Sequence, residues 1–362
     1  MSKAGLKYLP NLDSLRALAA LIVVISHIEL QKQELDLANI RSVVKDFGAI
    51  GVTSFFVLSG FLITYLLFQE HTSKGKIDIL KFYFRRILRI WPLYFVVLLF
   101  GIFIYPGNVD STGILLSVFF LPNIAFMLHK LPGLIDPIWS LGVEEQFYMF
   151  HPHFFRFRNL VLVFNILIGM FIFFYALKAA ASKFHWEFIQ NMMYKARFDC
   201  MMIGGIFGMW VKNNQTSRPH FKPWIRPDFM FDQTFQRLLF LVYAAYLFTV
   251  ILVKPNMYSD QLLSIFTALI IANLALNPAC IISIENKQLA FIGKISFGLY
   301  LLHKFPVHLM IVTTQNLGIK SLFFQNLFIY TTSVALSILI AYLSFHYYES
   351  YFLRLKDRKY TV

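Results

Sequence analysis

Residues 47–68 read FGAIGVTSFFVLSGFLITYLLF and contain no charged side chain. A helix of about 20 such residues is long enough to cross the hydrocarbon core of a membrane. The whole chain has this character, because 58% of its 362 residues are hydrophobic and only 14% are charged. Soluble domains are about 45–50% apolar and about 25% charged. The composition excludes a disordered chain and an ordinary soluble protein, and the continuous apolar runs exclude an outer-membrane barrel.

Eleven apolar segments of this kind follow one another, and no soluble domain fits between or after them. Their approximate bounds are 12–30, 47–68, 88–105, 112–128, 137–155, 159–178, 196–211, 235–253, 261–276, 289–311 and 322–346. We therefore predict an all-α fold, a polytopic transmembrane helix bundle that forms a single domain over residues 1–362. The first run lacks a small-residue cleavage site, so we expect a retained helix and not a cleaved signal peptide.

Basic residues set the expected orientation. The net charge is +14, and Lys and Arg gather in the N-terminal tail, in 69–90, in 212–234 and in the C-terminal tail. Positively charged loops are typically cytoplasmic, so we place all four inside. Two cytoplasmic termini require an even number of crossings, which leaves about ten spans and one re-entrant or interfacial segment. We expect that segment at 112–128 or 137–155, while the lysines of 178–195 fit this scheme poorly.

The first apolar run carries two ionisable residues, Arg16 and His27. They are eleven residues apart, about three helical turns, so they share one helix face and are separated by about 16 Å along the axis. Ionisable side chains inside a membrane are costly and by default mark a function. Asp13 lies three residues before Arg16 and is placed to pair with it. The structural alternative is a snorkelling arginine and a histidine that packs between helices.

Arg85, Arg86 and Arg89 form a cluster at the start of the run 88–105. Arg86 and Arg89 are three residues apart and Arg85 and Arg89 are four apart, so each pair shares a helix face. Guanidinium groups clustered in this way bind phosphate with bidentate geometry. Positive-inside topology and lipid head-group binding explain the same cluster, and for the cluster alone that explanation is favoured.

Residues 137–148 read PIWSLGVEEQFY and place Glu144 and Glu145 inside an apolar stretch. Adjacent carboxylates there need partners or protonation. Ser140 is a candidate helix N-cap that would put Glu144 in the first turns. An interfacial aromatic belt that includes Trp139 is an equally good structural interpretation.

Two weaker features and several absences complete the survey. Ser59-Gly60 favours close helix packing, and for His303 a structural role is the favoured interpretation. The sequence contains no zinc spacing, P-loop, HExxH, GxSxG or dinucleotide fingerprint, so we expect no metal.

Taken together, these stretches resemble the acyltransferase-3 family of integral membrane acyltransferases, which O-acylate, most often O-acetylate, glycans and related envelope molecules. The resemblance extends from Leu12 to about Glu349 and departs from the family at Ser350, where a proline is common. Five stretches carry it in order, namely Arg16 with His27, Phe55 to Phe61, Arg86 to Arg89, Trp139 to Tyr148, and Tyr300 to His303.

The resemblance implies a donor, an acceptor and a location. The donor would be a cytoplasmic acyl-CoA, expected to be acetyl-CoA, used as a substrate and not held as a tightly bound cofactor. The acceptor would be a hydroxyl of a saccharide, lipid-linked saccharide or envelope glycan such as an O-antigen or exopolysaccharide, bound by the membrane domain alone. The protein would be integral to the bacterial inner membrane, in contact with its lipid, and would not bind nucleic acid.

The resemblance also implies that the first-helix histidine and arginine and the RxxR arginines serve the activity. We expect Arg85, Arg86 and Arg89 to hold the CoA phosphates and the pantetheine arm to run past Arg16 to His27. An imidazole suits proton transfer near neutral pH, so His27 is the expected general base. A covalent acyl-histidine stage stays open.

Glu144 is expected to orient His27 or to stabilise its charged form. The supporting residues are Asp13, Trp139, Ser140, Tyr148 and His303. Two other classes of function fit the residues themselves: a flippase or transporter of a lipid-linked saccharide, and a non-catalytic membrane scaffold.

Overall fold

The structure, a computed structural model, describes residues 9–104, 110–216, 219–221, 227–252 and 259–360, and within these ranges it is helical and contains no strand. Its α-helices are α1 (Leu12–Glu34), α2 (Arg41–Lys74), α3 (Ile79–Ile104), α4 (Ser111–Val118), α5 (Pro122–Met127), α6 (Ile138–Phe154), α7 (Leu160–Lys183), α8 (Glu187–Ala196), α9 (Phe198–Asn214), α10 (Gln233–Leu252), α11 (Ser259–Leu276), α12 (Lys287–Lys294), α13 (Ser296–Leu302), α14 (Lys304–Asn316), α15 (Leu322–Leu343) and α16 (Ser350–Tyr360). A 3₁₀ turn at Pro227–Phe231 precedes α10, and a π-helical turn at Ser344–Glu349 joins α15 to α16.

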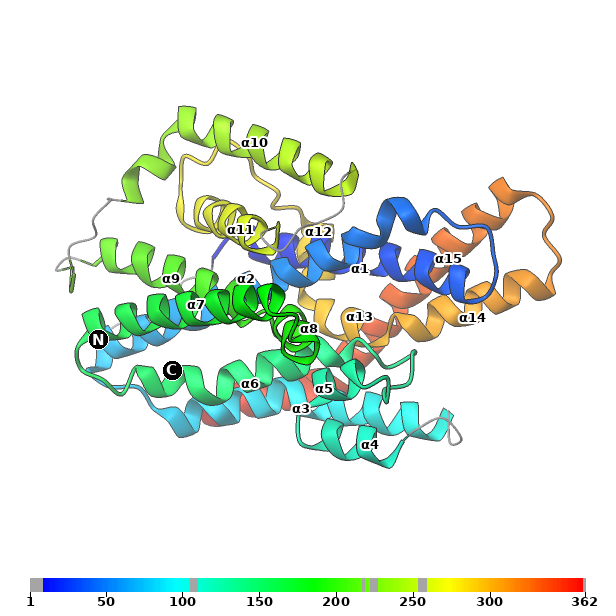
Figure 1. Cartoon of the computed structure of the whole chain (residues 1–362), viewed down its shortest axis with the longest axis horizontal. Coiled ribbons are helices and arrows are strands. Elements are labelled where there is room, and N and C mark those ends of the chain that lie inside the picture. The colour runs from blue at the N-terminus through cyan, green and yellow to red at the C-terminus, as the bar shows by residue number, and fades with distance from the viewer. Residues whose placement is uncertain (1–8, 105–109, 217–218, 222–226, 253–258, 361–362) are drawn as a thin grey trace.

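The long helix α2 lies at the centre of the bundle, packed between α1 and α9 (Figure 1). Glycines bring α2 and α9 close together. A Cβ atom on Gly60 would lie 2.0 Å from the carbonyl oxygen of Met201, and one on Gly204 would lie 2.1 Å from that of Val57. The close helix contact predicted at Ser59-Gly60 is therefore confirmed.

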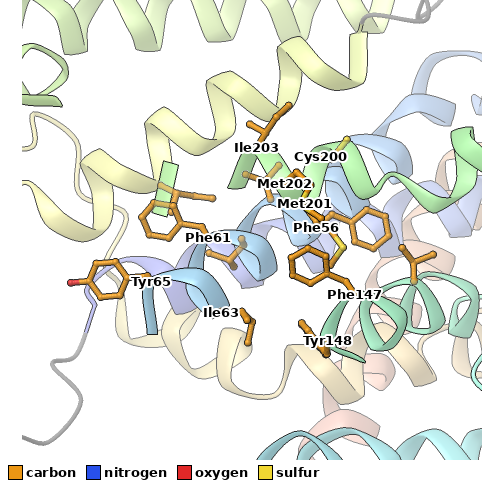
Figure 2. Close-up of a cluster of buried hydrophobic side chains, with 14 of the residues drawn as sticks. Phe56, Phe61, Ile63, Tyr65, Phe147, Tyr148, Cys200, Met201, Met202 and Ile203 are labelled. Atoms are coloured by element: carbon orange, nitrogen blue, oxygen red, sulfur yellow. The ribbon is translucent and has the colours of Figure 1, made fainter. Parts of the chain in front are cut away.

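Large apolar side chains fill the space between α2, α6 and α9. Figure 2 shows Phe56 and Phe61 of α2 beside Met201 of α9 and Phe147 of α6, all of them fully or almost fully buried. This core fixes the positions of α2 and α6, whose polar residues line the site described below.

Five helical stretches are long and apolar enough to cross a membrane. They are Asp46–Lys74, Ile79–Phe103, Leu160–Lys183, Ser259–Leu276 and Leu322–Lys356. These stretches support an integral membrane protein, whereas the expected count of about ten spans is not confirmed. Two of the expected spans form helices of only 17 residues, α6 and α9.

The run 112–128 is not one helix. It forms α4 and α5, of 8 and 6 residues, with Phe120 between them in the left-handed region at φ 57°. At 1.5 Å per residue these helices are about 12 and 9 Å long, too short for a hydrocarbon core of about 30 Å. The run 137–155 forms the continuous helix α6. Of the two candidates for the segment that does not cross, the structure favours 112–128.

Two other expectations need correction. The run 289–311 is broken into α12, α13 and α14, and not one span; Pro306 contributes to the second break because it has no N–H for the carbonyl of Leu302. The stretch 69–90 is mostly helical, since α2 ends only at Gly75 in the left-handed region and α3 begins at Ile79. The arginine cluster therefore lies inside α3.

The lysines of 178–195 fit the positive-inside pattern poorly, and two of their contacts explain why. Lys178 is buried, with its Nζ 3.6 Å from Oδ2 of Asp260 on α11. The Nζ of Lys195 lies 5.5 Å from the ring centroid of Trp139. Both ammonium groups interact with other residues of the protein. They therefore say little about which side of the membrane the segment 178–195 faces.

The glycine contact gives a test of the packing. We expect Gly204→Ala to destabilise the protein by about 1–3 kcal/mol or more, because the new methyl group meets the backbone of α2, which cannot move aside freely. Gly169→Ala in α7 is the matched control, since a Cβ there meets nothing within 4 Å. Thermal unfolding in detergent should give a lower Tm for Gly204→Ala alone, and equal Tm values would contradict the close contact.

Candidate functional site

A cavity of about 190 Å³ opens among α1, α2, α3, α6 and α13. Apolar side chains of α2 form much of its wall. Its polar lining residues come from all five helices and are Arg16, Ser59, Arg86, Arg89, Ser140, Glu144, Tyr148, Ser296 and Tyr300. Stretches that lie far apart in the sequence, from residue 16 to residue 300, therefore meet at one cavity.

Arg16 and Asp13 form the expected ion pair, with Arg16 Nη1 2.7 Å from Asp13 Oδ1. A second cavity, also about 190 Å³, lies next to the first and is lined by both of these residues. Arg16 and Arg89 line both cavities. The two cavities thus meet at a pair of arginines, one on α1 and one on α3.

The guanidinium of Arg86 lies beside two adjoining aromatic rings. Its guanidinium carbon lies 5.6 Å from the centroid of Phe82 and 5.4 Å from that of Tyr148. The buried Nε has no hydrogen-bond partner, and neither Arg86 nor Arg89 forms an ion pair within the residues that the structure describes. Cationic groups of this kind in a cavity wall can receive an anionic ligand.

Glu144 lies in the cavity wall, and its contacts differ from the expected ones. Its carboxylate accepts hydrogen bonds at 3.0 Å from Ser59 Oγ and from the hydroxyl of Tyr148. The expected contact with His27 is not made, because both oxygens of Glu144 are engaged on α2 and α6. Its neighbour Glu145 accepts a hydrogen bond of 2.9 Å from the indole of Trp91.

The partner of His27 is a second histidine, His303. Nδ1 of His27 lies 2.7 Å from Nε2 of His303, and the rings are stacked with centroids 4.9 Å apart. His303 is completely buried, whereas His27 is partly exposed. The sequence favoured a structural role for His303 and did not predict its contact with His27. The two residues are 276 positions apart, so no spacing along one helix links them.

The surroundings of His303 determine where the protons of the neutral pair lie. Its Nδ1 is 2.8 Å from the carbonyl oxygen of Tyr300 and 3.2 Å from that of Leu299. A carbonyl oxygen only accepts, so this nitrogen carries the proton and Nε2 of His303 is the acceptor. Nδ1 of His27 then donates to it, which leaves a lone pair on Nε2 of His27.

A short wall separates this histidine pair from the first cavity. His27 and His303 are not among the lining residues, whereas Ser140 and Tyr300 are. The hydroxyl oxygens of Ser140 and Tyr300 are 2.7 Å apart and share a hydrogen bond. The carbonyl oxygen of Tyr300 accepts a hydrogen bond from Nδ1 of His303. Tyr300 thus contacts both sides: it lines the arginine-lined cavity, and its carbonyl oxygen accepts a hydrogen bond from His303.

Besides His27 and His303, two predicted site residues lie outside both cavities. Arg85 lines neither cavity, because its Nη2 lies 3.3 Å from Glu70 Oε2 on α2. Trp139 stacks on Phe126, with centroids 5.8 Å apart, and packs edge-on against Phe56. The sequence prediction grouped three arginines in one phosphate site. In the structure Arg86 and Arg89 line the cavity, whereas the guanidinium of Arg85 faces the carboxylate of Glu70.

Sequence reasoning missed other residues of the site. Tyr300 appeared only within a quoted stretch, and Ser59 only as a packing residue, yet both line the cavity. Buried Lys304 places its Nζ 2.9 Å from Asp136 Oδ2, directly after His303 in the chain. A lysine beside a histidine in an apolar run was the available signal. Among the described residues, no group of three or more His, Cys, Asp or Glu is placed to hold a metal ion.

A labelling experiment tests whether water reaches the first cavity. In a background in which Cys200 and Cys280 are serine, we expect Ser59→Cys to react with a small polar methanethiosulfonate reagent, because this position is partly exposed in the cavity wall. Ser333→Cys is the control, since Ser333 is completely buried on α15. Equal labelling of the two positions would argue against an open cavity.

The chain is similar to curated O-acetyltransferases over nearly its whole length. The chain is 27% identical over 395 residues to the peptidoglycan O-acetyltransferase OatA of Listeria monocytogenes, with 98% of this chain and 59% of that protein covered. It is 28% identical to a putative O-acetyltransferase of Staphylococcus aureus strain COL, with 96% and 58% covered, and 26% identical to O-acetyltransferase OatA of S. aureus strain NCTC 8325, with 95% and 57% covered.

The chain therefore spans less than three fifths of the length of these curated relatives. No solved structure matches it. The sequence pattern of one family, described as an acyltransferase domain, matches residues 9–346, which is nearly the whole chain. The chain belongs to this family, the acyltransferase-3 family.

Proposed function

We propose that this protein is an integral membrane O-acetyltransferase that moves an acetyl group from cytoplasmic acetyl-CoA to a hydroxyl of an envelope glycan. The observation that carries the proposal is the cavity in which Arg16, Arg86 and Arg89 gather, whose lining residue Tyr300 also contacts His303 of the histidine pair. Membership of the acyltransferase-3 family supports the same reaction class.

The arginines are the donor-binding part of the proposal. Arg86 and Arg89 would bind the CoA phosphates, because guanidinium groups form bidentate, charge-assisted hydrogen bonds with phosphate oxygens. Arg16 lies between the two cavities, already oriented by Asp13. About 16 Å along α1 separates Arg16 from His27, which leaves length for an extended arm between phosphates and thioester.

His27 would act as the general base. Its Nε2 takes the proton of the acceptor hydroxyl while the oxygen attacks the carbonyl carbon of the thioester. The carbon–sulfur bond then breaks, and the departing CoA thiolate takes the proton from the imidazolium, so that atoms and charge balance. His303 holds His27 in the tautomer that has this lone pair available.

Tyr300 is the part of the wall that must move for the thioester to reach His27. Its hydroxyl is bonded to Ser140, and its ring lies 6.2 Å from that of His303. Rotation of this one side chain would join the cavity to the histidine pair.

The acceptor is proposed from chemistry and from the relatives together. The Listeria relative is named for peptidoglycan, a glycan of the cell envelope. For this chain we propose a saccharide hydroxyl that reaches Nε2 of His27, at the bacterial inner membrane with both termini cytoplasmic. Basic residues in the tails and in 212–234 support this orientation.

Replacing the base tests the proposal directly. We expect His27→Ala to lower acetyl transfer by about 100-fold or more, the range in which general bases contribute. The measurement is transfer from labelled acetyl-CoA to a panel of envelope glycans by the protein in lipid vesicles. His308→Ala on α14 is the control, because His308 lines neither cavity. Wild-type transfer by His27→Ala would refute the mechanism, and saccharide crossing the vesicle membrane without acyl-CoA would favour a transporter.

A second substitution tests the positioning role of His303. In His303→Gln the side-chain carbonyl can still accept from Nδ1 of His27, so we expect kcat to fall by less than about tenfold. His303→Leu removes the acceptor, and we expect a loss of about 100-fold in kcat with little change in the KM for acetyl-CoA. Steady-state kinetics checks both values; equal losses in the two variants would indicate a packing role alone.

A further inference from the structure

The second cavity carries basic residues that the proposed mechanism does not use. It lies among α1, α3, α12, α13, the π-helical turn and α16. Its basic residues are Arg16, Arg89, Lys294 and Lys356, and its acidic residues are Asp13 and Glu349. Four basic minus two acidic side chains give a net charge of +2. Asp13 is paired with Arg16, and the other charged residues of the lining, Arg89, Lys294, Lys356 and Glu349, give the same net charge of +2.

The fold brings these charges together from distant parts of the chain. Helix α12, which ends at Lys294, packs on α1, and α16, which carries Lys356, packs along α3 (Figure 1). Close packing on α1 is visible at Gly293, where a Cβ atom would lie 1.8 Å from the carbonyl oxygen of Asp13. Lys294 and Lys356 thereby join Arg16 and Arg89 around one cavity.

Aromatic side chains accompany the charges. Phe297 lines both cavities, and Phe345 lines the second one only. Phe345 and Glu349 belong to the π-helical turn Ser344–Glu349, a rare geometry that occurs frequently at functional sites. Aromatic faces beside basic groups suit a nucleobase with its phosphates, whereas a lipid head group needs only the charges.

The order of groups along the two cavities gives the direction of the ligand. Asp13 is fourteen residues before His27, so the second cavity lies about 21 Å from His27 along α1, beyond Arg16. The sequence of features is therefore Lys294 and Lys356, then Arg16 and Arg89, then Tyr300, then His27. An acyl-CoA has its parts in the same order: nucleotide, diphosphate, pantetheine and thioester.

We infer that the second cavity binds the 3′-phosphoadenosine end of the acyl donor, with Lys294 and Lys356 on its 3′-phosphate and Phe345 against its adenine. This inference rests on the proposed function, because it assigns the donor's nucleotide to a cavity next to the phosphate-binding arginines. It adds a specificity site that the arginine cluster alone does not provide.

The experiment compares two donors, acetyl-CoA and S-acetyl-4′-phosphopantetheine, which lacks the 3′-phosphoadenylate part. In the double variant Lys294→Gln/Lys356→Gln we expect the KM for acetyl-CoA to rise about tenfold or more, since charge-assisted contacts to phosphate are lost. The KM for the short donor should stay unchanged. Phe345→Leu should act on acetyl-CoA in the same selective way.

A matched double variant controls for charge and position. Lys287→Gln/Arg358→Gln removes one basic residue from each of the same helices, and both residues are exposed and line neither cavity. We expect it to leave both KM values unchanged. Equal KM values in the two double variants would overturn the inference, as would a KM increase that is the same for both donors.

Direct binding separates this inference from the proposed function. We expect adenosine 3′,5′-bisphosphate to bind the wild-type protein in detergent and to bind the Lys294→Gln/Lys356→Gln variant at least about tenfold more weakly. If the nucleotide binds and needs the two lysines, but the protein transfers no acetyl group, the nucleotide site is supported and the proposed transferase activity is refuted. Lysine-dependent retention of phosphatidylglycerol, with no binding of the nucleotide, would assign the cavity to lipid head groups and overturn the inference.

Discussion

The cost of a charge inside an apolar bundle governs the arrangement of this protein. An ion removed from water must be paired and hydrogen-bonded, or the folded state loses several kcal/mol. At one end of α1, Lys32 Nζ lies 2.6 Å from Glu29 Oε1 and 2.8 Å from Asn326 Oδ1. The hydroxyl of Tyr330 completes this buried set by donating to Glu29 at 2.7 Å. Against these satisfied pairs, the guanidinium groups of Arg86 and Arg89 in the cavity wall stand out, because within the described residues neither forms an ion pair.

Helix α1 extends from the buried Glu29–Lys32 pair to the cavity that Arg86 and Arg89 line. Its far end is fixed by the Glu29–Lys32 network and its near end by Asp13, Arg16 and the close contact with Gly293. His27 lies between these two anchors, on a segment that has little freedom to shift along its axis. A rigid element of this kind suits a site in which a phosphate anchor and a base must keep a fixed separation.

Much of the fold was predictable from the sequence, since apolar runs and their length report on membrane helices directly. The helical class, the helix face shared by Arg16 and His27, and the pairing of Asp13 with Arg16 all follow from spacing along one helix. Contacts between helices do not follow from spacing. The His27–His303 pair, the turn of Arg85 toward Glu70 and the bonds of Glu144 to Ser59 and Tyr148 depend on how α1, α2, α3, α6 and α13 pack, which no periodicity encodes. The helix breaks within 289–311 were missed for a related reason, because the hydropathy is continuous there although the helix is not.

The two cavities are lined by more basic than acidic residues, and this balance favours an anionic ligand over a neutral one. The first cavity holds three arginines and one glutamate, and that glutamate is already engaged by two hydroxyl donors. Without a ligand, Arg16 of α1 and Arg86 and Arg89 of α3 place three positive charges around one cavity, where they repel one another. An anion bound between them would supply the missing partner and stabilise the folded state in proportion to its affinity. In the proposed reaction the two ends of the site have different tasks. The arginine-lined end would bind phosphate, whereas the histidine pair would take up and return a proton, for which the carbonyl of Tyr300 fixes the tautomer.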